Sequence, residues 1–266
     1  MNKRIEVRDI METVFDIVYL SIVIGLGIYF LRQAKTLEHP TTLILYGSMT
    51  LILGIGDSFH LIPRIFSNLS KYPSKWNSYL GLGKMITSIT MTIFYVVLFW
   101  VWKYIYPTNH VPVFLDYIVS GVALLRIFLC LLPQNKWAEN KDEAPWPTIR
   151  NLPFYILGSI VVILYAYSAI KMHDGFRFMP IAITLSFLFY IPVTIYAKRY
   201  PKVGMLMICK TIMYIWIVTM GFNLLLKSNS IKSYGMIDTN LGGVLYDKTT
   251  STSFKYCTRR NDTLKC

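Results

Sequence analysis

The sequence predicts an all-α fold, a polytopic transmembrane bundle of about seven helices. Two observations on composition support this class: 54% of the 266 residues are apolar and only 15% are charged, whereas average soluble domains carry about 25% charged residues. The apolar residues also gather in runs that approach or exceed the roughly 20 residues that cross a bilayer as a helix. A soluble domain of this length would not need such runs to build a core. The chain is therefore predicted to be an integral membrane protein.

Seven apolar runs, separated by short polar connections, define the predicted helices. Their expected ranges are about 11–31, 42–63, 79–102, 112–132, 153–171, 179–198 and 203–226. Together they form a predicted transmembrane domain over residues 1–227. The composition then changes at 228–266 to Ser, Thr, Asn, Gly and Lys, which is typical of a flexible tail. No small-residue cleavage site follows the first run, so we expect that run to remain as a helix.

The positions of lysine and arginine predict the orientation. Twelve of these residues lie in the N-terminal segment or in the loops after the second, fourth and sixth runs: Lys3, Arg4, Arg8, Arg64, Lys71, Lys75, Lys136, Lys141, Arg150, Lys198, Arg199 and Lys202. The other loops and the start of the tail hold seven: Arg32, Lys35, Lys103, Lys171, Arg177, Lys227 and Lys232. Because short cytoplasmic loops carry the excess of Lys and Arg, we expect a cytoplasmic N-terminus and an extracytoplasmic C-terminus. The net charge of +13 is then explained by topology and contact with anionic lipid, without nucleic acid as a partner.

Five charged residues within the predicted spans are expected to lie at one depth. They are Asp16, Asp57, Lys84, Arg126 and Lys210, each about five to seven residues from the cytoplasmic end of its span. At roughly 1.5 Å per residue, all five lie about 8–10 Å below the cytoplasmic surface. Each unpaired charge would cost up to roughly 2.5–3.5 kcal/mol on insertion scales. We therefore expect a layer of ion pairs that faces the interior of the bundle.

Two Gly-x-Gly motifs place an acidic and a basic residue in neighbouring spans. They are GIGD at 54–57 and GLGK at 81–84. These spans form an antiparallel hairpin, so we expect Asp57 and Lys84 to reach the same depth and to pair. The glycines would let the two helix backbones approach closely, as small residues do in membrane proteins.

The candidate binding residues are this layer and two of its neighbours. His60 and Arg64 follow Asp57 at positions i+3 and i+7, on the same helix face. The full set is Asp16, Asp57, His60, Arg64, Lys84, Arg126 and Lys210. Because cations outnumber carboxylates, we expect the layer to bind an anionic small molecule or a lipid headgroup. Transport or sensing of that ligand stays open, and so does a structural or accessory role in which the charges form only ion pairs.

A membrane-embedded lipid-modifying enzyme is the alternative from another class of function. Asp57, Ser58 and His60 suggest it, with His60 as a general base or a metal ligand. The stretch GIGDSFH resembles the Gly-x-Gly-Ser…Phe-His segment of the seven-span alkaline ceramidase and adiponectin-receptor superfamily, which implies zinc-dependent lipid hydrolysis. That superfamily has a His-x-x-x-His pair in its last helix, whereas the last run here reads CKTIMYIWIVTMGFNLLL. The sequence therefore predicts no metal site and no cofactor, and it assigns no catalytic residue.

Four segments carry a second resemblance. They are GDSFHLIPR (56–64), GLGKMITSITMTIFY (81–95), LPQNKW (132–137) and RNLPF (150–154). In combination they resemble a group of uncharacterised bacterial multi-pass membrane proteins, which implies a location in the bacterial cytoplasmic membrane and no particular activity.

The longest connection, 133–152, has two open interpretations. Its tryptophans, Trp137 and Trp146, are typical of a loop that lies at the membrane interface. The alternative is a lid over the charged layer, with Arg150 pointing inward.

Overall fold

A computed structural model of the chain describes most of the predicted transmembrane domain and two short segments of the tail. The described residues are 6–37, 40–107, 112–140, 145–172, 174–196, 200–226, 258–260 and 263–265. Within them, seven helices are long and apolar enough to cross a membrane. This finding confirms the all-α, polytopic class, and the protein is a multi-pass membrane protein.

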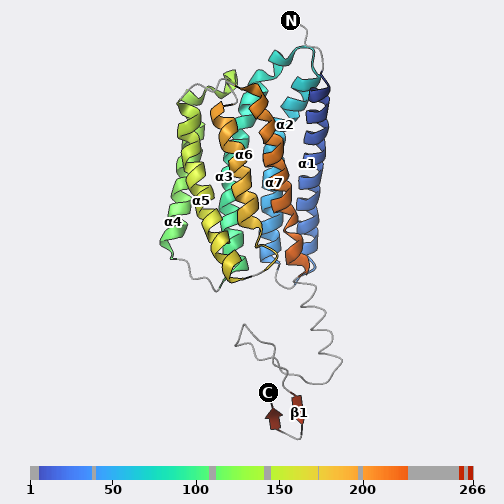
Figure 1. Cartoon of the computed structure of the whole chain (residues 1–266), viewed down its shortest axis with the longest axis vertical. Helices are drawn as coiled ribbons and strands as arrows, with labels where there is room; N and C mark the ends of the chain where they lie inside the picture. Colours follow the sequence, from blue (N-terminus) through green and yellow to red (C-terminus); the bar gives the residue numbers. More distant parts are fainter. Residues whose placement is uncertain are drawn as a thin grey trace. The chain divides into compact units, whose positions relative to one another are not determined.

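The seven helices lie side by side and alternate in direction (Figure 1). They are α1 (Val7–Ala34), α2 (Thr41–Leu69), α3 (Asn77–Ile105), α4 (Phe114–Leu131), α5 (Trp146–Lys171), α6 (Met179–Tyr196) and α7 (Leu206–Thr219). They fall into one compact unit, Met1–Asn223. Large aromatic side chains fill its interior, among them Tyr19, Tyr46, Tyr95 and Trp102. Exposed Leu and Phe side chains cover outward positions such as Leu124 and Phe128 of α4, as a surface in contact with lipid requires.

A second unit, Leu224–Cys266, contains the predicted tail. Within residues 228–266, the described part is an antiparallel pair of short strands, β1 (Thr258–Arg260) and β2 (Thr263–Lys265). The rest of the tail beyond residue 226 lies outside the described residues. So do several of the basic residues that predict the orientation: Lys3, Arg4, Lys141, Lys198, Arg199, Lys227 and Lys232.

Helix α1 begins before its apolar run because its first turn is capped. The carboxylate of Asp9 accepts a hydrogen bond of 3.1 Å from the backbone N–H of Glu6, at the position that precedes the helix. The Glu6 side chain in turn faces the backbone N–H of Asp9. Such a reciprocal cap satisfies backbone amides that have no partner within the helix. Polar residues can therefore lengthen a transmembrane helix beyond the part that hydropathy detects.

Helix α5 begins seven residues before its predicted range, which began at 153. It begins at Trp146, with Pro147 in its first turn and Pro153 inside the helix. Proline is tolerated in a first turn because the N–H groups there have no partner in the helix. Part of the predicted loop is thus helical. The described remainder contains two 3₁₀ turns, η2 (Pro133–Asn135) and η3 (Trp137–Glu139).

Helix α7 also differs from the continuous run that the sequence predicts. It follows a 3₁₀ segment, η4 (Pro201–Met205), and ends at Thr219 before the chain resumes a helical path at residue 222. The carbonyl of Ile217 accepts a hydrogen bond from the Tyr46 hydroxyl, and the N–H of Gly221 bonds to Val218 at 3.1 Å. The Tyr46 hydroxyl of α2 therefore bonds to a carbonyl that, in a regular helix, would accept only from the N–H of Gly221.

Helices α2 and α3 approach each other at glycine, as the sequence predicts. A Cβ atom on Gly56 would lie 2.1 Å from the Thr90 hydroxyl, and one on Gly83 would lie 2.2 Å from the carbonyl oxygen of Phe59. The Thr87 hydroxyl, in turn, donates to the Gly56 carbonyl at 3.0 Å. These contacts leave no room for any side chain.

The other glycine of each motif faces a third element. A Cβ atom on Gly54 would lie 2.8 Å from Ile24 of α1, and one on Gly81 would lie 1.6 Å from the carbonyl oxygen of Trp137 in η3. Each Gly-x-Gly motif therefore packs against two neighbours, and GLGK brings the η3 turn directly onto α3.

Candidate functional site

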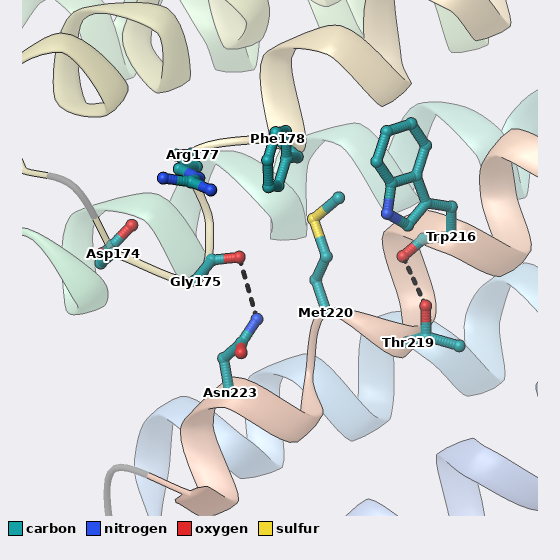
Figure 2. Close-up of a pocket in the computed structure, with 8 residues that line it drawn as sticks. All are labelled: Asp174, Gly175, Arg177, Phe178, Trp216, Thr219, Met220 and Asn223. Carbon is teal, nitrogen blue, oxygen red and sulfur yellow. Dashed lines mark hydrogen bonds between the residues drawn. The ribbon is translucent and has the colours of Figure 1, made fainter.

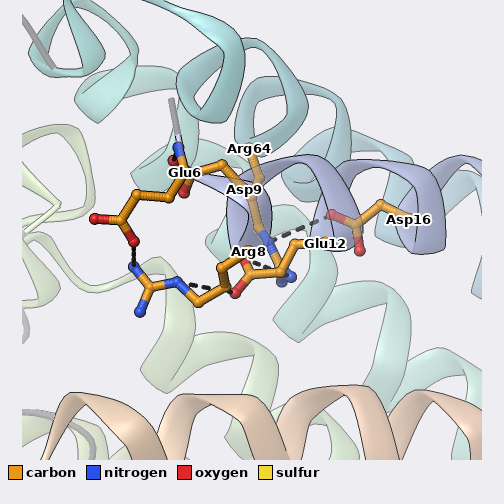
Figure 3. Close-up of polar contacts among 6 residues, drawn as sticks. All are labelled: Glu6, Arg8, Asp9, Glu12, Asp16 and Arg64. Carbon is orange, nitrogen blue, oxygen red and sulfur yellow. Dashed lines mark hydrogen bonds and ion pairs between the residues drawn. The ribbon is translucent and has the colours of Figure 1, made fainter. Parts of the chain in front are cut away.

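The first part of the charged layer is an ion-pair network between α1 and α2. Arg64 of α2 places its Nε 3.3 Å from Asp16 and its Nη2 3.5 Å from Glu12, both on α1 (Figure 3). Asp16 is only 2% exposed. Arg8 lies at the outer edge of the network, 4.0 Å from Glu12. Two of the predicted site residues, Asp16 and Arg64, are thus brought together as a pair.

This pair gives a first testable prediction. We expect Arg64→Met to lower the free energy of unfolding by about 3 kcal/mol, because it leaves the buried Asp16 carboxylate without its cation. Adding Asp16→Asn should recover at least about 1 kcal/mol of that loss. Thermal unfolding of the two single variants and the double variant in detergent measures both effects. Arg8→Met is the control, since its exposed pairs should contribute little. If the losses from Arg64→Met and Asp16→Asn simply add, the two side chains are not coupled.

Asp57 lies close to α1 and α7. Its carboxylate accepts a hydrogen bond of 2.6 Å from the hydroxyl of Tyr19 on α1, and it interacts electrostatically with Lys210 of α7. Tyr19 was not among the predicted site residues, although it follows Asp16 by three residues and so shares its helix face. Asp57 is therefore a counter-ion for Lys210, and the Tyr19 hydroxyl fixes the position of the Asp57 carboxylate.

The expected ion pair between Asp57 and Lys84 is wrong. The Lys84 ammonium donates at 2.8 Å to the side-chain oxygen of Asn140, directly after η3, and no ion pair within 4 Å joins it to Asp57 in the described part of the chain. The reason is helix geometry: successive residues are about 100° apart around the axis. Because Gly56 and Gly83 occupy the contact between α2 and α3, the residues after them turn away from it.

His60 lies between the two halves of the layer. It interacts electrostatically with Lys84 and Arg64, and its Nδ1 is enclosed with no hydrogen-bond partner from any described residue. Ser58, its neighbour in the alternative catalytic interpretation, donates its hydroxyl to the Ile55 carbonyl at 2.6 Å. That hydroxyl is therefore engaged by its own helix.

The second part of the layer is a deep pair of cations, Arg126 of α4 and Lys210 of α7, named the cation pair below. Arg126 is 2% exposed, and its guanidinium carbon lies 3.6 Å from the centroid of the Phe154 ring. Its Nε and Nη1 have no hydrogen-bond partner among the described residues. The Lys210 ammonium lies 4.4 Å from the Tyr190 ring centroid and 5.2 Å from that of Tyr214.

The charges around the cation pair do not balance. Arg126 and Lys210 interact with each other as like charges. Asp57 interacts with Lys210, and among the described residues no other carboxylate interacts with either cation. Of the described residues, those that interact with the cation pair therefore include one carboxylate against two cations, with aromatic rings beside them.

The described part of the connection before α5 covers this region. Trp137 is 8% exposed and donates its indole N–H to the carbonyl of Cys130 at 2.8 Å. The guanidinium of Arg150 lies 4.1 Å from the Trp137 ring and donates to Asn135 at 3.1 Å. Arg150 is buried, as the lid interpretation expects, and Trp137 is packed inside the protein instead of lying at its surface. Opening of this segment as a lid stays a prediction.

No metal site is found among the described residues, and comparisons with known proteins give no finding for the chain. Among the described residues, no group of three or more His, Cys, Asp or Glu side chains is placed to hold a metal ion. Comparisons with protein-family models, curated proteins and solved structures give no match to this chain. The function is therefore inferred from the geometry of the layer.

Proposed function

We propose that this membrane protein binds an anionic group, from a small molecule or a lipid headgroup, at the cation pair of Arg126 and Lys210. The observation that best supports this proposal is the Arg126 guanidinium, which is buried with two nitrogens that lack an acceptor in the described part of the chain. An unpaired buried charge costs several kcal/mol. A carboxylate or phosphate would supply two acceptors in the planar geometry that a guanidinium presents.

The other residues of the layer have distinct roles in this proposal. Lys210 adds a second positive charge next to the anion, and Asp57, held by Tyr19, keeps that ammonium in place. Arg64 and Asp16 form the structural ion pair between α1 and α2. Lys84 lies toward η3, where it donates to Asn140, and His60 interacts electrostatically with Lys84, at the end of the bundle at which α3 begins. With the orientation predicted from Lys and Arg, that end faces the cytoplasm of a bacterial cell.

Anion-dependent thermal stability tests the proposal. We expect saturating phosphatidic acid or phosphatidylglycerol to raise the melting temperature of delipidated wild type by about 5 °C or more, since a ligand stabilises the state that binds it. Inorganic phosphate and glycerol phosphate form a parallel series that separates a soluble anion from a lipid as the source. Lys210→Met should lose most of the shift.

The control for this experiment is Lys171→Met. Lys171 is an exposed cation at the other end of the bundle, where it donates to Tyr167, so its removal changes the net charge equally without touching the cation pair. We expect this variant to keep the full shift. Equal shifts in wild type and Lys210→Met would contradict binding at the cation pair.

A further inference from the structure

An open pocket lies at the end of the bundle opposite to the charged layer. It has a volume of about 430 Å³ and lies between the segment that leads into α6 and the C-terminal end of α7 (Figure 2). The side chains that give it its chemistry are Asp174, Arg177, Phe178, Trp216, Met220 and Asn223. Sites for small molecules occupy roughly 300–1,000 Å³. The pocket is large enough for a ligand, and it shares no residue with the cation pair.

The acidic side of the pocket is held in place by neighbouring groups. The Asp174 carboxylate accepts hydrogen bonds from the Tyr106 hydroxyl at 2.8 Å and from the Phe176 N–H at 3.0 Å. Burial and, after it, the contact with Asp174 raise the pKa of Tyr106, so the phenol keeps its proton and remains the donor. The side-chain amide of Asn223 donates to the Gly175 carbonyl at 2.9 Å, which ties the segment before α6 to the residues after α7. The negative charge therefore has a defined position.

The remaining wall is basic and aromatic. The Arg177 guanidinium is exposed and lies 4.5 Å from the centroid of the Phe178 ring. Phe178 and Trp216 stand next to each other with ring centroids 6.2 Å apart and planes tilted by 32°. Met220 lies between these walls in Figure 2 and is nearly buried. Aromatic faces attract ammonium groups, and guanidinium groups bind phosphate through paired hydrogen bonds.

We propose that this pocket binds the zwitterionic headgroup of a phospholipid, with the phosphate facing Arg177 and the ammonium facing Asp174 and the rings of Phe178 and Trp216. One cation and one carboxylate at the same pocket match a ligand that carries both charges. A purely anionic ligand would meet Asp174, and a purely cationic one would meet Arg177. Tryptophan at the end of a transmembrane helix lies at the depth of lipid headgroups. The exposed apolar side chains of Phe178 and Ile181 continue toward the membrane, along the course that acyl chains would take.

Native mass spectrometry of the delipidated full-length protein, titrated with phosphatidylethanolamine or phosphatidylglycerol of identical acyl chains, tests this inference. We expect Arg177→Gln to weaken phosphatidylethanolamine binding by about tenfold or more. Its effect on phosphatidylglycerol should be small. Because the cation pair is intact in wild type and in Arg177→Gln, a difference in lipid binding between these two proteins reports on the pocket alone. Lys171→Gln is the matched control, a cation on the same end of the bundle and outside the pocket, and it should bind like wild type.

A second variant and a soluble competitor complete the test. Trp216→Leu removes the ring that faces the ammonium and should also weaken phosphatidylethanolamine binding several-fold, because the attraction between the aromatic face and the ammonium is lost. Glycerophosphoethanolamine, which has the headgroup without acyl chains, should compete poorly. Equal loss of both lipids in Arg177→Gln, or no loss of either, would overturn the proposal. Competition by the soluble headgroup at the affinity of the lipid would overturn a phospholipid as the ligand.

Discussion

Arg126→Met is expected to make the ligand-free protein more stable while abolishing its binding of anions. The guanidinium is buried with two nitrogens that have no acceptor among the described residues, so a methionine of similar length removes a desolvation cost without breaking a hydrogen bond. Replacing buried charges by apolar side chains stabilises proteins by about 1–4 kcal/mol in favourable cases. We therefore expect the melting temperature of delipidated protein to rise by about 5 °C.

Arg150→Met is the matched control for this variant. Both arginines are buried in the same half of the bundle and lie against an aromatic ring. Arg150, however, donates a hydrogen bond to Asn135, so its replacement should lower the melting temperature. A decrease of similar size in both variants would show that Arg126 has a stabilising partner in the protein itself, which would remove the main support for a binding site.

Gly83→Ala is expected to cause a large loss of stability, because it forces α2 and α3 apart. Its new Cβ would lie 2.2 Å from the Phe59 carbonyl oxygen and 2.8 Å from the Cα of His60. Those are backbone atoms, so the two helices must separate. Overpacking of this kind costs about 3 kcal/mol, which corresponds to a fall of about 10 °C in melting temperature.

Gly121→Ala provides the comparison. Apart from its chain neighbours and the backbone of its own helix, no described atom lies within 4 Å of the position that its Cβ would take, and alanine favours a helix over glycine by about 1 kcal/mol. Scanning fluorimetry in one detergent should show a small rise for Gly121→Ala and a large fall for Gly83→Ala. Equal melting temperatures would mean that α2 and α3 do not approach at Gly83 as described.

The number, order and approximate positions of the helices were predictable because hydropathy reports directly on membrane insertion. The ends of the helices were less predictable, because they depend on polar residues that hydropathy excludes. Glu6 and Asp9 extend α1 through a cap, and Trp146 and Pro147 start α5 seven residues before its predicted range. At the end of α7, the hydroxyl of Tyr46 on α2 alters the helical hydrogen bonding. That contact depends on packing between helices far apart in the sequence.

The charged layer was predictable as a set of residues, whereas its internal pairing was not. Counting residues from the helix ends gives depth, and helical periodicity gives the shared face of Asp57, His60 and Arg64. Neither gives the rotation of one helix against the next. The close contact at Gly56 turns Asp57 away from Lys84, so Asp57 interacts with Lys210 and Lys84 donates to Asn140, neither of which sequence spacing reveals.

The pocket between α6 and α7 was not predicted at all. Its residues come from two segments about 40 positions apart, and each segment alone has the composition of an ordinary membrane-interface loop or helix end. In the sequence, Arg177 stands out only as one of the basic residues that predict the orientation. Its relation to Asp174 and Trp216 follows from the antiparallel packing of α6 on α7, which brings the start of one helix next to the end of the other.

The measurement that tests the central claim most directly is native mass spectrometry of gently purified wild type and Arg126→Met, with identification of any retained lipid or metabolite. We expect wild type to retain an anionic species at a fixed stoichiometry, Arg126→Met to lose it, and Lys171→Met to keep it. The same species at the same occupancy in wild type and Arg126→Met, or none in either, would contradict an anion site at the cation pair. Arg126 and Lys210 would then belong, with Arg64 and Asp16, to a structural layer of charge.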